Sequence, residues 1–512
     1  MKLVSSLRFT VTASLALALH VTPVRSFEEC TYGLLYVSES GNATEAKIHE
    51  LSLDPSDNFY LKESMLISKL IGKPNQALES TSNGRFLMSL DWGSEEMGNT
   101  DGAVNFIDTG ASAEPHGEHL HIILENVKVL SNIGLACGPI WHPKENSGLI
   151  TLFCDGNRDL NVTSKFYVMD ESMLGSSKNP YVFNKTLKGA HHGMAVPIDE
   201  SHILHTLYEK NHSWGSDILQ VVNLKGDVVY SLTDKSNPDS YCKDYHGSTI
   251  VNQTVFLCCA DHILSVKHDN DLTEWSSQAL TFPNTLGSRH RCGDLKGSNE
   301  FGYLITDYAD WDADPSVPHL AAFPVGADEL LDSDVLTLEG GQCYFELEKS
   351  REKHLIVMVP NGTVYVYTFG RPDGWKVQAS IEPKDIGNLN HCDNATLSSG
   401  YAHFYVNVPS TRMLYAIDMT HVDHGELIVT STELDFTPGY MTVSAVPKGT
   451  GCSLDFHDSA HDEDVHDEDE HDHDHEEDKE LSEKESSSAT GIIHVNYLLL
   501  ITGTVAFVTM VV

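Results

Sequence analysis

The chain has 512 residues, and its 74 Asp and Glu against 33 Lys and Arg give a formal net charge of -41. Such an acidic chain is a poor partner for nucleic acid, because a phosphate backbone requires a basic protein surface. The same negative field favours local enrichment of cations. The composition therefore excludes nucleic-acid binding and is compatible with cation binding.

Residues 1–26 have the features of a secretory signal peptide. Lys2 and Arg8 precede an apolar stretch from Phe9 to Val21, and small residues follow near Ser26. The apolar stretch is too short, and its flanks are wrong, for a retained membrane span. We therefore expect the rest of the chain to enter the secretory pathway.

Residues 27–453 are rich in short β-type runs and poor in patterns with helical periodicity. Gly, Asn, Asp and Pro separate the runs, as expected for strands joined by tight turns. The predicted strands cover residues 34–40, 85–92, 103–110, 148–154, 165–170, 203–209, 218–224, 228–232, 254–259, 262–268, 302–308, 355–360, 363–369, 402–408, 413–419 and 426–434.

A recurring unit of strands and turns predicts the fold. The units are about 40 to 60 residues apart, a spacing typical of β-propeller blades, each of which is a four-stranded sheet. They begin near Gly33, Gly84, Ser147, His192, Thr249, Gly302, Lys353 and Gly400. We predict an all-β propeller of about eight blades, with seven as the alternative. An array of β-sandwiches fits less well, because no linker interrupts the series.

Cysteines and glycosylation sequons indicate an extracellular setting. The 10 cysteines are an even number, as expected for disulfides in an oxidising compartment. The predicted pairs are Cys137 with Cys154, Cys242 with Cys258 or Cys259, Cys343 with Cys392, and Cys30 with Cys452. Acceptor sequons for N-glycans occur at Asn42, Asn161, Asn184, Asn211, Asn252, Asn361 and Asn394.

Three histidine segments are expected to meet in the channel of the propeller, because residues before each inner strand line that channel. They are AHHGMAVPID with His191 and His192, YCKDYHGSTIV with Asp244 and His246, and NLNHCDNATL with His391 and Asp393. Three or four imidazole nitrogens, with or without a carboxylate, match a tetrahedral zinc site. Alternatively, one of the aspartates holds a ligating imidazole in a single tautomer from outside the metal shell.

A fourth segment, PHGEHLH, contains His116, Glu118, His119 and His121 in a predicted loop. Gly117 allows the backbone to turn, and the last two histidines alternate as in an extended chain. So many potential ligands in a short loop are typical of a metal-capture arm, and an exposed polar loop is the alternative. We expect this arm to deliver or withdraw ligands during metal exchange at the channel site.

At these motifs the chain resembles the AztD family, bacterial periplasmic zinc metallochaperones with a β-propeller fold. The matching segments are PHGEHLH after VNFIDTG, LITLFCDG, AHHGMAVP, and YCKDYHG followed by VFLCCADHILSV, and the resemblance extends loosely over residues 33–446. It implies a secreted protein that binds zinc and passes it to a transport system by direct contact. It also implies zinc-loop ligands His116, His119 and His121, and channel ligands His191 or His192, His246 and His391.

The chain departs from that family in two respects. Family members often carry His where this chain has Gly138 and Cys343, and the cysteine is a candidate for a disulfide instead. The bacterial relatives lack a C-terminal anchor signal, and they deliver to a periplasmic solute-binding protein of an importer. The resemblance therefore supports zinc binding better than it supports a delivery route.

Residues 454–488 are acidic and rich in histidine, with little apolar surface to bury, and we predict that they are disordered. Imidazoles and carboxylates together suit borderline divalent cations, zinc first. The candidate low-affinity ligands are His457, His461, His466, His471, His473 and His475. A solvating acidic spacer is the alternative interpretation.

Residues 489–512 form the last predicted segment. Small residues from Ser486 to Ala489 precede a short spacer and an apolar tail. This pattern is typical of a GPI-anchor signal, and a single-pass helix without a cytoplasmic tail is the alternative. We therefore expect the folded region at the cell surface, on the extracellular face of the plasma membrane.

The predicted function is capture of zinc outside the cell and its presentation for uptake, with a plasma-membrane zinc transporter as the candidate receiver. Catalysis is not expected, because the sequence contains no nucleophile elbow, H-E-x-x-H or phosphate-binding glycine loop. The alternatives are a hydrolase whose zinc ion activates water, and an adhesion or scaffold propeller with an acidic stalk.

Overall fold

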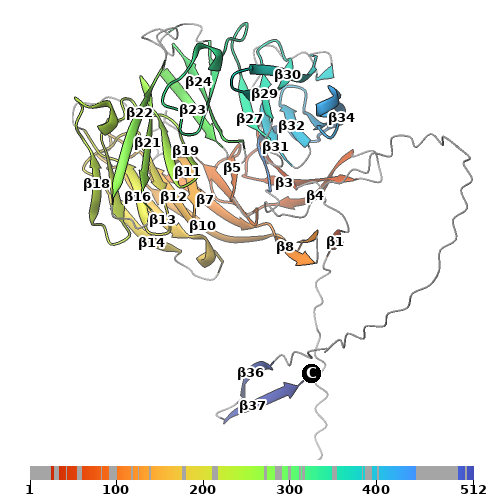
Figure 1. The fold of residues 1–512 in the computed structure, drawn as a ribbon. Coiled ribbons are helices and arrows are strands. Elements are labelled where there is room, and N and C mark those ends of the chain that lie inside the picture. Colours follow the sequence, from red (N-terminus) through yellow and green to blue (C-terminus); the bar gives the residue numbers. More distant parts are fainter. Residues whose placement is uncertain are drawn as a thin grey trace, which may run out of the picture. The chain divides into compact units, whose positions relative to one another are not determined.

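Strand pairing in the computed structural model divides the folded region into eight four-stranded antiparallel sheets (Figure 1). The sheets are the blades of a β-propeller, which confirms the predicted fold class with eight blades rather than seven. The structure describes residues 25–27, 34–41, 43–54, 60–81, 84–91, 101–116, 119–124, 126–137, 140–175, 180–209, 217–269, 274–282, 291–297, 301–310, 313, 317–348, 354–382, 385–386, 395–400, 403–444, 494–501 and 504–511.

Blades 3 to 8 are simple meanders in which the first strand of each blade is innermost. Blade 3 contains β11 (Ile140–Asn146), β12 (Leu149–Cys154), β13 (Lys165–Asp170) and β14 (Tyr181–Thr186). Blade 4 contains β15 (Ala195–Pro197), β16 (His202–Thr206), β17 (Leu219–Asn223) and β18 (Val228–Leu232). Blade 5 contains β19 (Ser248–Val251), β20 (Thr254–Cys258), β21 (His262–His268) and β22 (Trp275–Thr281). Blade 6 contains β23 (Arg291–Gly297), β24 (Tyr303–Ala309), β25 (His319–Pro324) and β26 (Val335–Leu336). Blade 7 contains β27 (Tyr344–Leu347), β28 (Leu355–Met358), β29 (Val364–Gly370) and β30 (Gly374–Ile381). Blade 8 contains β31 (Thr396–Ser399), β32 (His403–Val408), β33 (Met413–Asp418) and β34 (Ile428–Glu433).

Blade 1 joins the two ends of the propeller. Its innermost strand is the last one in the chain, β35 (Pro438–Val443), which pairs with β2 (Leu35–Glu39), followed by β3 (Ile48–Asp54) and β4 (Tyr60–Ile67). In Figure 1 the blue strands of blade 8 accordingly lie beside the orange and red strands of the first blades.

Blade 2 carries an insertion. It contains β5 (Ala77–Ser80), β6 (Phe86–Asp91), β7 (Asp101–Asp108) and β10 (Lys128–Ala136). Between its last two strands the chain forms the hairpin of β8 (Ala111–His116) and β9 (His119–Leu124), and β9 also pairs with β1 (Arg25–Phe27). The predicted histidine loop is therefore a pair of strands in a separate sheet.

The strand order defines two ends of the channel. We call the end at which the inner strands begin the mouth, and the opposite end the base. Because successive strands of a blade are antiparallel, connections from first to second and from third to fourth strands lie at the base. Connections from second to third strands, and from one blade to the next, lie at the mouth.

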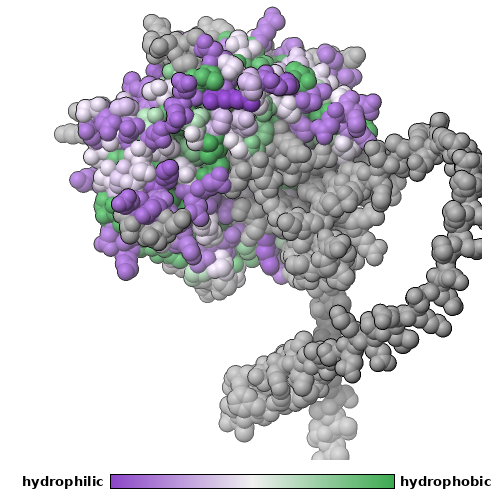
Figure 2. All heavy atoms as spheres, in the orientation of Figure 1, coloured by the Kyte–Doolittle hydropathy of each residue, from purple (hydrophilic) through white to green (hydrophobic). Residues whose placement is uncertain are grey.

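Apolar side chains between neighbouring blades form the core. Both faces of a middle strand are buried, which is why β12 and β32 read as almost continuous apolar runs. In blade 8, Phe404 and Val406 pack against blade 7, whereas Tyr405 packs against blade 1. Each of the eight junctions has such a cluster. The visible outer face is mainly hydrophilic (Figure 2).

Tight turns follow from the residues at the strand ends. Ser147 and Gly148 separate β11 from β12, and both have positive φ, 51° and 75°. Two positive-φ residues make a turn whose twist matches that of the paired strands, and Gly adopts this conformation without steric cost.

The remaining described elements are few. The helical turns are 3-10 segments: η3 (Glu171–Met173), η4 (Pro238–Ser240), η6 (Asp332–Asp334) and η8 (Val422–His424). The contacts divide the chain into two units, residues 1–454 and 455–512, and the described part of the second is the hairpin of β36 (His494–Ile501) and β37 (Thr504–Val511). Among the described residues, no helix has the length and apolarity needed to cross a bilayer.

Three disulfides lie at the mouth. Cys137–Cys154 confirms a predicted pair, and Cys242–Cys259 confirms one of two predicted alternatives. The third bond joins Cys258 to Cys292, a pairing that the sequence analysis did not predict. Cys343 is also disulfide-bonded, as expected. Cys30, Cys392 and Cys452 lie outside the described residues.

Closure of the ring by blade 1 is testable. Leu35 is fully buried on β2, beside the closing strand and blade 8. Leu35→Ala should lower the free energy of unfolding by about 2–5 kcal/mol, measured by urea denaturation, because a cavity forms at the closing junction. Val377→Ala, at a position 53% exposed, is the control and should change it by less than about 0.5 kcal/mol. Equal effects of the two substitutions would contradict this packing.

Candidate metal centre

The loop before β19 holds His246 at the mouth. The Cys242–Cys259 disulfide joins the start of the loop to the end of the neighbouring strand. The backbone N–H of His246 donates to the carbonyl of Cys258 at 3.0 Å, and the N–H of Cys258 donates to the carbonyl of Gly247 at 2.8 Å. The backbone that carries this histidine is therefore fixed from both sides.

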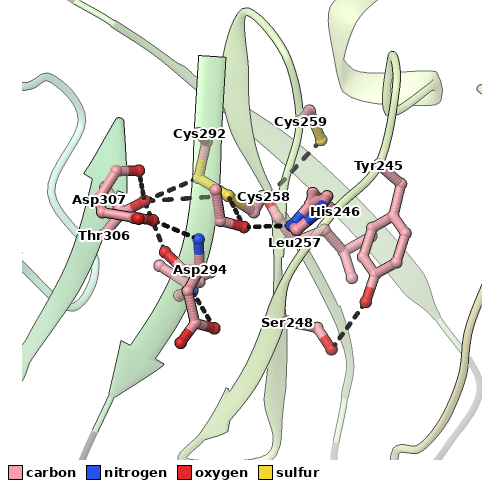
Figure 3. Close-up of a disulfide and its surroundings, with 12 residues drawn as sticks. Tyr245, His246, Ser248, Leu257, Cys258, Cys259, Cys292, Asp294, Thr306 and Asp307 are labelled. Atoms are coloured by element: carbon pink, nitrogen blue, oxygen red, sulfur yellow. Dashed lines mark hydrogen bonds between the residues drawn. A yellow bond between two sulfur atoms is a disulfide. The ribbon is translucent and has the colours of Figure 1, made fainter. Parts of the chain in front are cut away.

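The His246 ring is oriented by blade 6. Its Nδ1 lies 2.9 Å from the carbonyl oxygen of Gly293, so Nδ1 carries the proton and Nε2 keeps its lone pair. Gly293 follows Cys292, which is joined to Cys258, and Figure 3 shows the imidazole beside this disulfide. Burial lowers the pKa of His246. The neutral ring is the form that binds a metal ion.

His192 lies beside His246, in the loop before β15 of the neighbouring blade 4. Its Nδ1 is 2.8 Å from Oδ2 of Asp155, a residue at the mouth end of β12. The rings of His192 and His246 are 6.1 Å apart between centroids, with 41° between their planes. The fold therefore brings together two histidines that are 54 residues apart in the chain, as predicted for the loops before the inner strands of blades 4 and 5.

The two imidazoles are held in the way that is typical of metal-ligating histidines. Protein-bound imidazoles usually hold a carboxylate or carbonyl through one ring nitrogen and bind metal through the other. Here Asp155 and the Gly293 carbonyl occupy Nδ1 of the two rings. Neither partner is the predicted Asp244. Within the described ranges, no group of three or more His, Cys, Asp or Glu is arranged to hold a metal ion. The described pair alone therefore offers two imidazoles for a metal ion.

His191 lies beside His192 in the chain but has different surroundings. Its Nδ1 is 3.1 Å from the Ser164 hydroxyl, and its Nε2 is 3.2 Å from the Thr206 hydroxyl. Burial lowers its pKa to about 4. Because protein groups occupy both ring nitrogens, we leave His191 out of the ligand pair.

Among the described residues, none of the other predicted metal ligands is seen beside this pair. His116, His119 and His121 lie on β8 and β9, where only the backbone is described. That hairpin connects a third strand to a fourth and therefore leaves blade 2 at the base, away from the mouth. The predictions for Glu118, His391, Asp393, His457, His461, His466, His471, His473 and His475 fall outside the described residues.

The sequence analysis missed several residues of this site. Asp155 follows the buried strand LITLFC, and its position in the segment LITLFCDG was the available signal. Asp294 lies on the inner strand of blade 6, next to the carbonyl that holds His246, and its side chain is 55% exposed.

No protein-family model and no curated protein matches the sequence. Among solved structures, the crystal structure of AztD from Citrobacter koseri is similar, with a TM-score of 0.62 and 17% identity over 81% of this chain and 98% of that chain. The structure of apo AztD from the same organism gives a TM-score of 0.61 and 15% identity over the same shares. At such identities the likeness establishes an AztD-like propeller fold.

The buried histidines predict how stability depends on pH. Burial lowers the pKa of His191 from 6.5 to about 4, and that of His205 to about 3. Below about pH 6.5 the unfolded state therefore binds more protons than the folded state, and stability falls as the pH falls. The lowered pKa of His191 corresponds to roughly 3 kcal/mol between about pH 7 and about pH 4.

Urea denaturation of the wild type and of His191→Gln at a series of pH values checks this expectation. The variant should lose less stability on acidification, because carboxylates common to both proteins cancel in the comparison. Identical pH slopes would mean that His191 is not buried in its neutral form.

Proposed function

We propose that this protein binds zinc at the mouth of its propeller through His192 and His246 and presents it outside the cell for uptake. The observation that carries the proposal is the pair of imidazoles 6.1 Å apart, each held through Nδ1 by a protein acceptor. A centroid separation of this size is within the span of two imidazoles bound to one ion, since zinc–nitrogen bonds are about 2.0–2.1 Å long.

The AztD-like fold supports the same assignment. The sequence motifs at His192 and His246 are two of those that resemble the zinc metallochaperones, and the solved AztD structures share the fold. We therefore take zinc as the bound ion and transfer, rather than catalysis, as its purpose.

Further ligands are expected from segments outside the described residues. A tetrahedral zinc ion takes four ligands, and a site that must release its ion keeps one position for water or a partner. His290 directly precedes β23, and His391 precedes β31 by a few residues, so both belong to loops that lead into inner strands. We propose these two as the candidates that complete the shell.

The acidic histidine-rich segment supplies a second, weaker kind of binding in this proposal. Its many imidazoles and carboxylates raise the local zinc concentration, whereas the mouth holds one ion on ligands fixed beforehand. Secretion, surface anchoring and a plasma-membrane zinc transporter as receiver follow from the terminal sequence patterns and belong to the proposal. The transfer itself requires the ion to be reachable from outside.

Single substitutions test the mouth site. In the metal-depleted full chain, His192→Gln or His246→Gln should weaken zinc binding by more than the roughly 10–100-fold expected from losing a partner that orients a ligand. Asp155→Asn should fall within that roughly 10–100-fold range, because it removes only such a partner. The measurement is competition with a zinc chelator of known affinity.

His319→Gln is the matched control, because His319 lies on β25 and its Nδ1 accepts a hydrogen bond from the N–H of Leu338. This variant should bind zinc like the wild type. If all variants bound equally, or if the wild type kept no zinc after dialysis, the propeller would be an adhesion or scaffold module.

Removal of the acidic segment separates the two kinds of binding. A chain without residues 455–485 should bind fewer zinc ions per molecule, counted by atomic spectroscopy, because histidine ligands have been lost. Its tightest site should keep the wild-type affinity. Loss of that tightest site on deletion would place the main zinc ligands in the segment rather than at the mouth.

A further inference from the structure

A histidine–aspartate cluster lies at the base between blades 4 and 5, at the end opposite the His192–His246 pair. Asp199 belongs to the connection that follows β15, and His202 begins β16. His268 ends β21 in the next blade, and Trp275 begins β22. All of these positions lie at the base, so the fold brings them together from two neighbouring blades.

The contact between Asp199 and His268 does not have the geometry of a hydrogen bond. Nε2 of His268 lies 3.3 Å from Oδ2 of Asp199, yet this buried nitrogen has no hydrogen-bond partner. Nδ1 of the same ring is 2.7 Å from the carbonyl oxygen of Asp269, so Nδ1 carries the proton. In the neutral ring, the lone pair of Nε2 therefore faces a carboxylate oxygen while only 6% of the side chain is exposed.

We infer that a divalent transition-metal ion, zinc or one of similar chemistry, binds between Nε2 of His268 and Oδ2 of Asp199. Two ligand atoms on a tetrahedral zinc ion, each about 2.0–2.1 Å from the metal, lie about 3.3 Å apart. The observed separation of 3.3 Å matches that geometry. An imidazole nitrogen and a carboxylate oxygen also form a donor set that suits zinc.

Both ligands are held by the surrounding chain. The carbonyl of Asp269 orients the His268 ring, as backbone carbonyls do for ligating histidines. Asp199 accepts hydrogen bonds from the N–H of Ser201 at 2.6 Å and from the N–H of His202 at 2.9 Å. These bonds fix the carboxylate before a metal ion arrives.

His202 acts as a positioning residue. Its Nδ1 lies 2.9 Å from Oδ2 of Asp199 and donates to it, so this nitrogen is not a ligand. Among the described residues, no three His, Cys, Asp or Glu are grouped so as to hold a metal ion, and this site accordingly has two protein ligands. Water completes the shell, since the Asp199 side chain remains 17% exposed. The site is therefore weaker than a closed structural zinc centre.

A contact within blade 7 shows what an ordinary contact between a histidine and a carboxylate looks like at the base. There Nδ1 of His354 lies 2.6 Å from Oε2 of Glu348, which is a hydrogen bond. The proton on Nδ1 of His354 lies between the two atoms, so this contact needs no metal ion. The contact of His268 with Asp199 is longer and lacks the bond.

Trp275 provides a local probe. Its indole meets the rings of His268 and His202 edge to face, with centroids 5.0 Å and 5.4 Å away. Co²⁺ substitutes for zinc and quenches nearby indole fluorescence through its partly filled d shell. In the metal-depleted full chain, Co²⁺ should quench the emission that is lost in Trp275→Phe, and zinc should restore it by displacement.

His268→Gln and Asp199→Asn should each abolish this Trp275-dependent quenching. His262→Gln is the control on the same strand, because its ring nitrogens lie 2.7 Å from Asp261 Oδ1 and 3.1 Å from the Tyr241 carbonyl. His246→Gln should also leave the quenching intact, so this test is independent of the mouth site. Equal quenching in wild type and His268→Gln, or none in the wild type, would contradict metal binding at this contact.

Discussion

Burial of apolar side chains between neighbouring blades is the constraint on which this molecule depends. Each blade is buried on two sides, and the eighth junction exists only because β35 joins the sheet that begins with β2. A ring closed in this way holds the inner strands parallel around one axis, so the loops before them meet at one end. The contact of His192 with His246 and the base cluster both lie between blades 4 and 5, so the packing of these two neighbours sets both.

The mouth is more strongly constrained than ordinary loops would be. All three described disulfides lie there, and two of them flank the loop of His246. The Cys258–Cys292 bond connects the blade that carries this histidine to the strand whose Gly293 carbonyl orients it. In the proposed zinc site, ligands fixed in this way lose little freedom when an ion binds, which favours a single firm site over many loose ones. The acidic segment has the opposite composition, with many donors and little to order them.

The fold could be predicted because short apolar runs and turn residues repeat along the chain at the spacing of blades. The details of the site could not be predicted to the same degree, because they depend on contacts between blades. Asp155 matters only because blade 3 places it beside His192. The sequence does not distinguish the adjacent His191 and His192. In the structure, however, the ring of His191 contacts two hydroxyls and the ring of His192 contacts a carboxylate. The sequence does not show how many strands of blade 2 precede the β8–β9 hairpin, and this number decides the end of the channel at which the hairpin lies. After the third strand it lies at the base, whereas after the second strand it would lie at the mouth.

The adjacent half-cystines Cys258 and Cys259 have a consequence for how the chain matures. Consecutive side chains along a strand point to opposite faces, which is how one sulfur reaches Cys242 and the other reaches Cys292. A slip of β20 by a single residue would exchange the two sulfurs and cross-link the wrong partners. Oxidation must therefore come after the sheet has chosen its register, and a sulfur that reacts too early has to be reopened by exchange with another thiol. Folding of this chain is thus an ordered process, with sheet geometry ahead of covalent chemistry.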